Sequence, residues 1–116
     1  MKRYLLYITL TLLSACSTLK SDLTVQPGKQ FRLGGNQNGA FTVQLKNTGQ
    51  VPVTVSEQPA TGQSVVLGTF RPGEGKTVRF AAGSAALVDN ATDKSARLYL
   101  VVTGDKNLSM KEISRQ

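Results

Sequence analysis

Few side chains in this 116-residue sequence could perform chemistry. It contains no His and no Trp, one Cys at position 16, and seven acidic residues against fourteen Lys and Arg. His is the commonest general base and metal ligand, and a single Cys can form neither an internal disulfide nor a thiolate metal site. We therefore predict that the chain is not an enzyme, and we expect no metal or other cofactor.

The closest acidic pair, Asp89 and Asp93, is the one remaining candidate for chemistry. Two carboxylates could serve glycoside hydrolysis, and the loop DNATD could offer oxygen ligands to Ca²⁺. The residues between the two carboxylates are typical of a turn, however, where Asp is a solvated turn former. A carboxylate enzyme that uses Asp89, Asp93 or Glu74 is kept only as a third alternative.

The N-terminal segment has the layout of an export signal. Lys2 and Arg3 precede a ten-residue apolar run at positions 4–13, and small residues follow at positions 14 and 15. A membrane-spanning helix needs roughly 20 apolar residues, so this run is too short to remain as a span. We predict that residues 1–15 are a signal peptide that is removed.

The residues Leu13-Ser14-Ala15-Cys16 resemble the lipobox of bacterial lipoproteins. The resemblance implies a diacylglycerol group on the Cys16 sulfur, cleavage before Cys16, and acylation of the new amine by a fatty acid such as palmitate. Two or three acyl chains give stable anchoring, whereas one chain alone binds a membrane marginally. Ser17 takes the place of the Asp that resembles an inner-membrane retention signal, so the expected location is the outer membrane, facing the periplasm.

Apolar and polar residues alternate through the rest of the chain. Phe41, Val43 and Leu45 alternate with polar neighbours, as expected of a half-buried strand. The same alternation recurs in three later stretches, 51–57, 76–82 and 96–103. Weaker strand candidates lie at 23–25, 31–33, 65–70, 85–88 and 108–110.

Turn dipeptides such as Pro27-Gly28, Asn38-Gly39 and Pro72-Gly73 separate these stretches. The pattern predicts an all-β fold, an antiparallel β-sandwich of about seven to nine short strands. We expect the lipidated Cys and a short tether at 16–22 and the sandwich domain at 23–116. Pro52 predicts that its strand borders a sheet, because proline cannot donate to a neighbouring strand.

The segment FTVQLKNTGQVPVTV, followed by FRPGEGKTVRF, resembles bacterial immunoglobulin-like and related sandwich modules. The Cys pair and Trp of immunoglobulin domains are missing, and the resemblance implies a fold without a specific function. The stretches 45–55 and 88–100 also share a strand, an Asn, a polar turn and a second strand. Similar turn residues in two hairpins explain this internal similarity, and an ancient duplication is the alternative.

The stretch 96–103 supplies a candidate binding face. Arg97, Tyr99 and Val101 share the side of the strand opposite to Leu98 and Leu100. Aromatic residues and Arg are enriched at binding hot spots, so these three residues are the candidate partner-binding face. The alternative is that Tyr99 and Val101 pack against the other sheet or a loop. The GGNQNG loop at 34–39 is either a sugar or peptide contact or a plain exposed hairpin loop.

The chain that remains after removal of the signal peptide is predicted to be basic. Without residues 1–15 the chain keeps 12 basic and 7 acidic side chains, a formal charge of +5. We expect a lipid-anchored envelope protein with a binding or assembly role, such as an accessory subunit of an envelope complex. The alternative is direct binding of an anionic ligand such as lipopolysaccharide, peptidoglycan or a glycan. An exported, tethered protein is not expected to bind nucleic acid.

Overall fold

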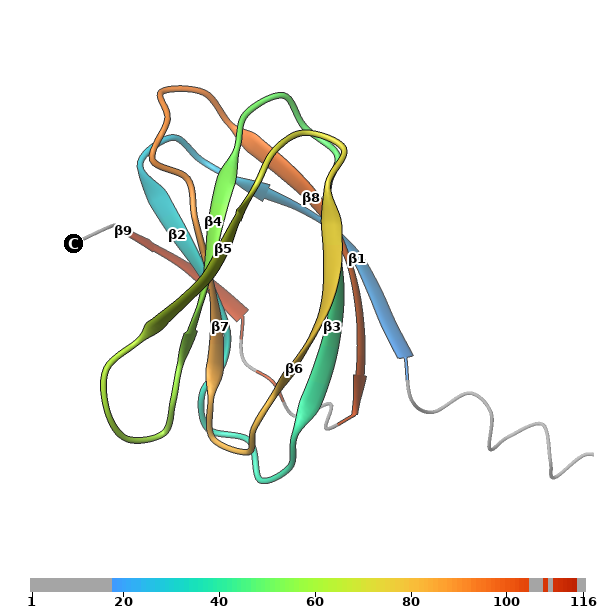
Figure 1. Cartoon of the computed structure of the whole chain (residues 1–116), viewed down its shortest axis with the longest axis vertical. Coiled ribbons are helices and arrows are strands. Elements are labelled where there is room, and N and C mark those ends of the chain that lie inside the picture. The colour runs from blue at the N-terminus through green and yellow to red at the C-terminus, as the bar shows by residue number, and fades with distance from the viewer. Residues whose placement is uncertain (1–17, 105–107, 109, 115–116) are drawn as a thin grey trace, which may run out of the picture.

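The strand candidates overlap β-strands in the computed structural model, which describes residues 18–104, 108 and 110–114 (Figure 1), although the candidate 108–110 overlaps one only at Met110. The strands of this described part are β1 (Thr18–Val25), β2 (Lys29–Gly34), β3 (Phe41–Asn47), β4 (Val53–Gln58), β5 (Val65–Phe70), β6 (Gly75–Phe80), β7 (Ala85–Asp89), β8 (Ala96–Gly104) and β9 (Met110–Ser114). The predicted signal peptide and Cys16 lie outside the described residues. No helix within the described ranges is long and apolar enough to cross a membrane.

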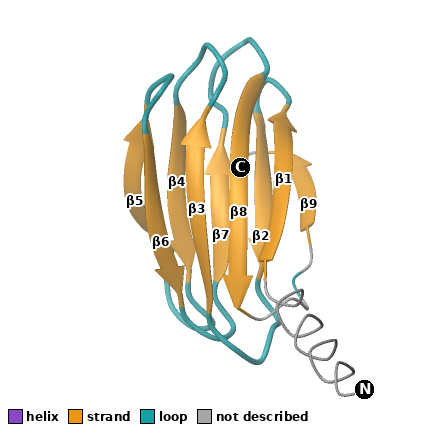
Figure 2. Ribbon diagram, turned by 90° about the vertical axis from the view of Figure 1, so that its right-hand side faces the viewer, coloured by secondary structure: helices purple, strands orange, loops and turns teal. Residues whose placement is uncertain are grey.

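The strands form two antiparallel sheets that face each other (Figures 1 and 2). Sheet A has the order β1-β8-β3-β6, and sheet B has the order β5-β4-β7-β2-β9. The predicted all-β sandwich is therefore confirmed. Strands distant in the sequence pair directly, since β1 lies beside β8 and β2 lies beside β7 and β9.

Strand boundaries differ from the sequence-based expectation at β1, β4 and β9, and β9 begins at Met110, the last residue of the candidate 108–110. Residues 18–22, assigned to the tether, belong to β1, because they pair with residues 99–103 of β8. The alternation of apolar and polar residues is weak in this segment, because β1 is an edge strand whose residues are mostly exposed. Pro52 precedes β4 instead of lying within it, and β4 is an inner strand of sheet B, between β5 and β7.

Apolar side chains from both sheets fill the space between the layers. Phe41 and Phe80 stack with ring centroids 5.1 Å apart, and both are almost completely buried. Leu33 and Leu98 are buried to a similar degree, one from each sheet. Because successive residues of a strand point to opposite faces, the residues between these core positions are directed to the outer surfaces.

Asn47, at the end of β3, is fully buried and organises the loop that follows it. Its amide nitrogen donates to the carbonyl oxygens of Val51, at 2.8 Å, and of Phe70, at 2.9 Å. Its side-chain oxygen accepts from the backbone nitrogen of Gly49 at 2.9 Å. The Asn47 side chain thus forms hydrogen bonds with backbone groups of the loop after β3 and of the end of β5.

Asn90, directly after β7, has the same arrangement in the other half of the chain. It is also fully buried, and its amide nitrogen donates to the carbonyl oxygens of Lys94, at 2.7 Å, and of Val25, at 3.0 Å. Its oxygen accepts from the backbone nitrogen of Thr92 at 3.0 Å. The internal similarity of the sequence therefore places Asn47 and Asn90 at equivalent positions in the fold.

The correspondence extends to the turns and to the strand order. The ends of β1 and β5 lead into Pro27-Gly28 and Pro72-Gly73, where both glycines have positive φ. Their backbone nitrogens donate to the carbonyl oxygens of Asn90, at 3.0 Å, and Asn47, at 2.8 Å. Each of the first four strands has a counterpart four strands later, so that β1 corresponds to β5 and β4 to β8. Exchanging every strand with its counterpart turns the order of sheet A, β1-β8-β3-β6, into β5-β4-β7-β2. This is the order of the first four strands of sheet B.

We predict that Asn47→Ala lowers the free energy of unfolding by about 3 kcal/mol, because it leaves buried backbone groups of the loop and of β5 unpaired. Asn38→Ala, an exposed substitution in another loop, is the matched control and should change stability little. Urea denaturation of the two variants measures the difference. Equal midpoints for both would show that Asn47 does not hold the loop.

Candidate functional site

The outer face of sheet A carries the residues predicted to bind a partner. Leu98 and Leu100 point into the core from β8, so the alternate residues Arg97, Tyr99 and Val101 point outward. Arg97 is exposed, and Tyr99 and Val101 are half-buried. The alternative, in which Tyr99 and Val101 pack against the other sheet, does not hold.

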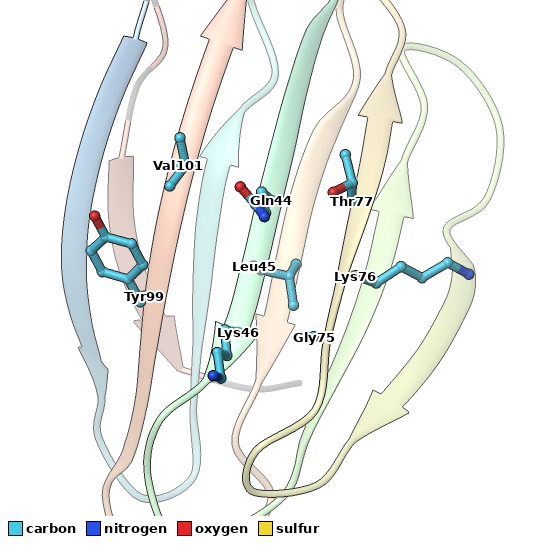
Figure 3. A pocket seen from close by; sticks show the side chains of 8 residues that line it. All are labelled: Gln44, Leu45, Lys46, Gly75, Lys76, Thr77, Tyr99 and Val101. Atoms are coloured by element: carbon cyan, nitrogen blue, oxygen red, sulfur yellow. The ribbon is translucent and has the colours of Figure 1, made fainter.

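A shallow groove of about 390 Å³ crosses this face over β8, β3 and β6 (Figure 3). Tyr99 and Val101 form its β8 side, and its remaining lining comes from Gln44, Leu45, Lys46, Gly75, Lys76 and Thr77. The register places Tyr99, Lys46 and Gly75 in one row across the three strands. A second row contains Val101, Gln44 and Thr77.

Gly75 opens the groove at its β6 side. A Cβ atom there would lie 2.6 Å from the carbonyl oxygen of Leu45, so the two strands approach closely at this position. Lacking a side chain, Gly75 leaves space in the row that Tyr99 and Lys46 share. Figure 3 shows the Lys76 side chain extending sideways, away from Gln44 and Tyr99.

Arg97 is separated from the other two predicted residues. It lines a smaller hollow of about 210 Å³ together with residues 48–51, 94 and 95. There the loop after β3 approaches β8, since the backbone nitrogen of Thr48 donates to the carbonyl oxygen of Arg97 at 3.0 Å. The structure thus brings Tyr99 and Val101 into one groove and places Arg97 beside it.

Sequence reasoning missed Gln44, Lys46 and Thr77 as part of the site. Their outward orientation follows from the alternation in their own strands, but their proximity to Tyr99 depends on the pairing of β3 with both β8 and β6. The intervening residues are too numerous for a local signal to indicate this pairing.

The outer face of sheet A is basic. Its outward positions hold Lys20, Lys46, Arg79 and Arg97, against the single carboxylate of Asp22. Within the described part of the chain none of these four cations forms an ion pair. The groove therefore has an aromatic and apolar side on β8, the cation of Lys46 in its middle on β3, and further positive charge around it.

The acidic residues considered for chemistry are dispersed. Asp89 lies on sheet B and accepts a hydrogen bond from the Gln30 amide at 3.2 Å. Glu74 closes the turn after β5 by accepting from the backbone nitrogen of Arg71 at 2.8 Å. Asp93 is exposed in its loop, and the described residues contain no cluster of three His, Cys, Asp or Glu side chains.

The two loops considered for ligands have structural roles. The Asn90 side-chain oxygen, a candidate Ca²⁺ ligand, is occupied by hydrogen bonds from Thr92. In the GGNQNG loop Gln37 is buried, donates to the carbonyl oxygen of Ser84 at 2.9 Å and accepts from the backbone nitrogen of Gly35 at 2.8 Å. Gln37 therefore fastens this loop to the one between β6 and β7.

Comparison with known proteins gives similarity in fold alone. No protein-family model and no curated protein matches the chain. Among solved structures, an uncharacterized double-stranded β-helix protein from Klebsiella pneumoniae has a TM-score of 0.57 at 8% identity, with 86% of this chain and 76% of that chain covered. The cupin domain of Drosophila melanogaster CENP-C has a TM-score of 0.51 at 15% identity, with 70% and 57% covered.

Bacillus subtilis oxalate decarboxylase, which has Mn(II) centres, has a TM-score of 0.57 at 14% identity. The alignment covers 91% of this chain and 26% of that chain. The chain thus spans little more than half of the Drosophila domain and about a quarter of the decarboxylase. These similar folds are cupin and double-stranded β-helix domains, so the immunoglobulin-like expectation for the sandwich is replaced by a cupin-like one.

Proposed function

We propose that this protein is a lipid-anchored envelope protein that binds a partner through the outer face of sheet A, without catalysis. The groove between Tyr99 and Gly75 is the observation that carries the proposal. It combines an aromatic side chain, a β-branched side chain and amide and hydroxyl groups on a rigid sheet. Aromatic side chains beside polar groups are typical of protein interfaces.

The lipobox supports the anchoring part of the proposal. β1 begins at Thr18, two residues after Cys16, and two extended residues span roughly 7 Å at most. An acylated Cys16 would hold the domain directly at the membrane surface. Attachment of this kind raises the effective concentration of membrane-bound partners, so a shallow groove can suffice for binding.

The placement of the acidic side chains supports binding over catalysis. Asp89 and Glu74 serve a cross-strand contact and a turn, and neither lines the groove. The cupin-like fold itself does not decide the matter. Similar structures include oxalate decarboxylase and a sugar phosphate isomerase on one side, and the CENP-C domain and the globulin procruciferin on the other.

A second candidate is supported by the charge of the same face. Four outward cations against one carboxylate favour an anionic ligand, such as a phosphorylated lipid or an acidic glycan of the envelope. In this version Tyr99 would stack on the ligand, and Lys46 would pair with its charge. The protein-partner version is preferred because Tyr99 and Val101 give the groove an aromatic and apolar side, and of the four outward cations Lys46 alone lines it.

We predict that Cys16→Ser leaves an unprocessed precursor without acyl groups, since the thiol is the only site at which the diacylglycerol can be attached. Mass spectrometry of the purified protein measures both the retained residues 1–15 and the added lipid mass. Processing identical to that of the parent protein would contradict the lipoprotein assignment. Cell fractionation then shows whether the acylated form resides in the outer membrane.

We predict that a photo-crosslinking residue at Val101, in the groove, captures one protein partner in cells. The same residue at Thr69, exposed on the outer face of sheet B, is the control. The adduct at Val101 should persist at raised ionic strength and be lost on Tyr99→Ala. Adducts restricted to lipid or glycan, and weakened steeply by salt, would favour the anionic-ligand version. Identical adducts from both positions would exclude sheet A as the binding face.

A further inference from the structure

The end of the sandwich at which β1 begins differs in composition from the opposite end. Figure 2 shows β1, β5 and β9 starting at the same end of the molecule. We call this the anchor end and define it by the start of β1 and by the loops 35–40, 59–64 and 81–84. We infer that the anchor end is a bilayer contact surface, and this inference rests on the lipid anchor of the proposed function.

The three loops of the anchor end form one connected surface. The backbone nitrogen of Gly83 donates to the carbonyl oxygen of Gln37 at 3.1 Å, which joins the loops 81–84 and 35–40. Ala60 lies against Gly83, because a Cβ atom on Gly83 would be 3.1 Å from the Ala60 Cβ. The loop 59–64 therefore belongs to the same surface.

None of these three loops contains a charged residue, as their sequences GNQNGA, PATGQS and AAGS show. The charged residues nearest to them in the sequence, Arg79 and Glu57, lie one residue inside β6 and β4, and the Arg32 guanidinium of β2 lies beside Gly35. The loops of the opposite end carry four exposed charges, Arg71, Glu74, Asp93 and Lys94. The connection between β8 and β9, which joins two strand ends at the anchor end, carries Asp105 and Lys106 and lies largely outside the described residues.

Exposed apolar side chains are concentrated at the anchor end. In the described ranges the exposed large hydrophobic residues are Leu19, Val65, Val66 and Met110, and each is the first or second residue of β1, β5 or β9. Val66 has 67% of its surface exposed and Val65 has 56%. Exposed apolar groups gathered on one surface indicate an interaction site.

The position of the anchor identifies the bilayer as the occupant. With Cys16 only two residues before Thr18, acyl chains on Cys16 bring this end against the lipid headgroups. Uncharged polar loops with exposed valines suit the boundary between headgroups and acyl chains, where a charged loop would lose hydration. A protein partner on this surface would have to displace the bilayer to which the chain is fixed.

The absence of Trp from the chain allows a direct test of this contact. Val66→Trp, at the anchor end, and Asp93→Trp, at the opposite end, each create a single tryptophan. Thr69→Trp, further along β5 on the outer face of sheet B, provides an intermediate position. Each full-length acylated protein is reconstituted in vesicles of zwitterionic lipid that contain brominated acyl chains, and quenching of the tryptophan emission is measured.

We expect several-fold stronger quenching and a blue-shifted emission for Val66→Trp than for Asp93→Trp, and this difference should vanish in the Cys16→Ser background. Equal quenching of Val66→Trp and Asp93→Trp in protein with confirmed acylation would overturn the inference and leave the lipid anchor intact. Equal quenching of Val66→Trp and Thr69→Trp would indicate that sheet B lies flat on the bilayer and would also overturn it.

Mass spectrometry separates these outcomes from failure of the proposed function. Protein that carries no acyl group on Cys16 would overturn the anchor, and the bilayer contact would fail with it. Urea denaturation of each variant shows that the substitution has not unfolded the sandwich. Val66 and Asp93 are both exposed, so neither substitution should disturb the core.

Discussion

The burial of Asn47 and Asn90 is the interaction on which the rest of the structure depends. Each lies where a strand ends and the chain must reverse, so backbone groups would otherwise be buried without partners. Asn47 joins its own loop to the end of β5, and Asn90 joins its own loop to the end of β1. Because the chain has one Cys and can form no internal disulfide, these amide contacts take the place of a covalent link between distant strands.

The two amides also determine the geometry of the candidate site. Asn47 is the last residue of β3 and pairs with Leu98 of β8, so its burial fixes the register of β3 against β8. That register places Lys46 beside Tyr99 and Gln44 beside Val101. A shift of one residue would turn Tyr99 into the core and Leu98 to the surface, which burial of the leucine prevents. The groove is therefore a consequence of how the core is packed.

Local patterns in the sequence predict the strands well and their arrangement poorly. Alternation identifies β3, β4, β6 and β8, and the outward orientation of Tyr99 follows from Leu98 and Leu100. The choice between immunoglobulin-like and cupin-like order depends on contacts such as β1 with β8 and β2 with β9, which join opposite ends of the chain. The sequence pattern does not reveal residues 18–22 as part of β1, because this edge strand carries polar residues on both faces. The repeated Asn and Pro-Gly turns were a usable signal, since each Asn carbonyl accepts from the glycine of the other half's turn.

The filled core and the proposed anchor together explain why the outer face of sheet A would be the binding surface. The space between the sheets is filled by side chains such as Phe41 and Phe80, and every buried polar side-chain atom in the described ranges has a hydrogen-bond partner. Binding groups are consequently available on the outer faces. If the anchor end rests on the bilayer, the strands of sheet A rise from the membrane, and the groove faces sideways above it. A partner fixed to the same membrane would then meet the groove by lateral diffusion, and modest affinity would be enough for a stable complex.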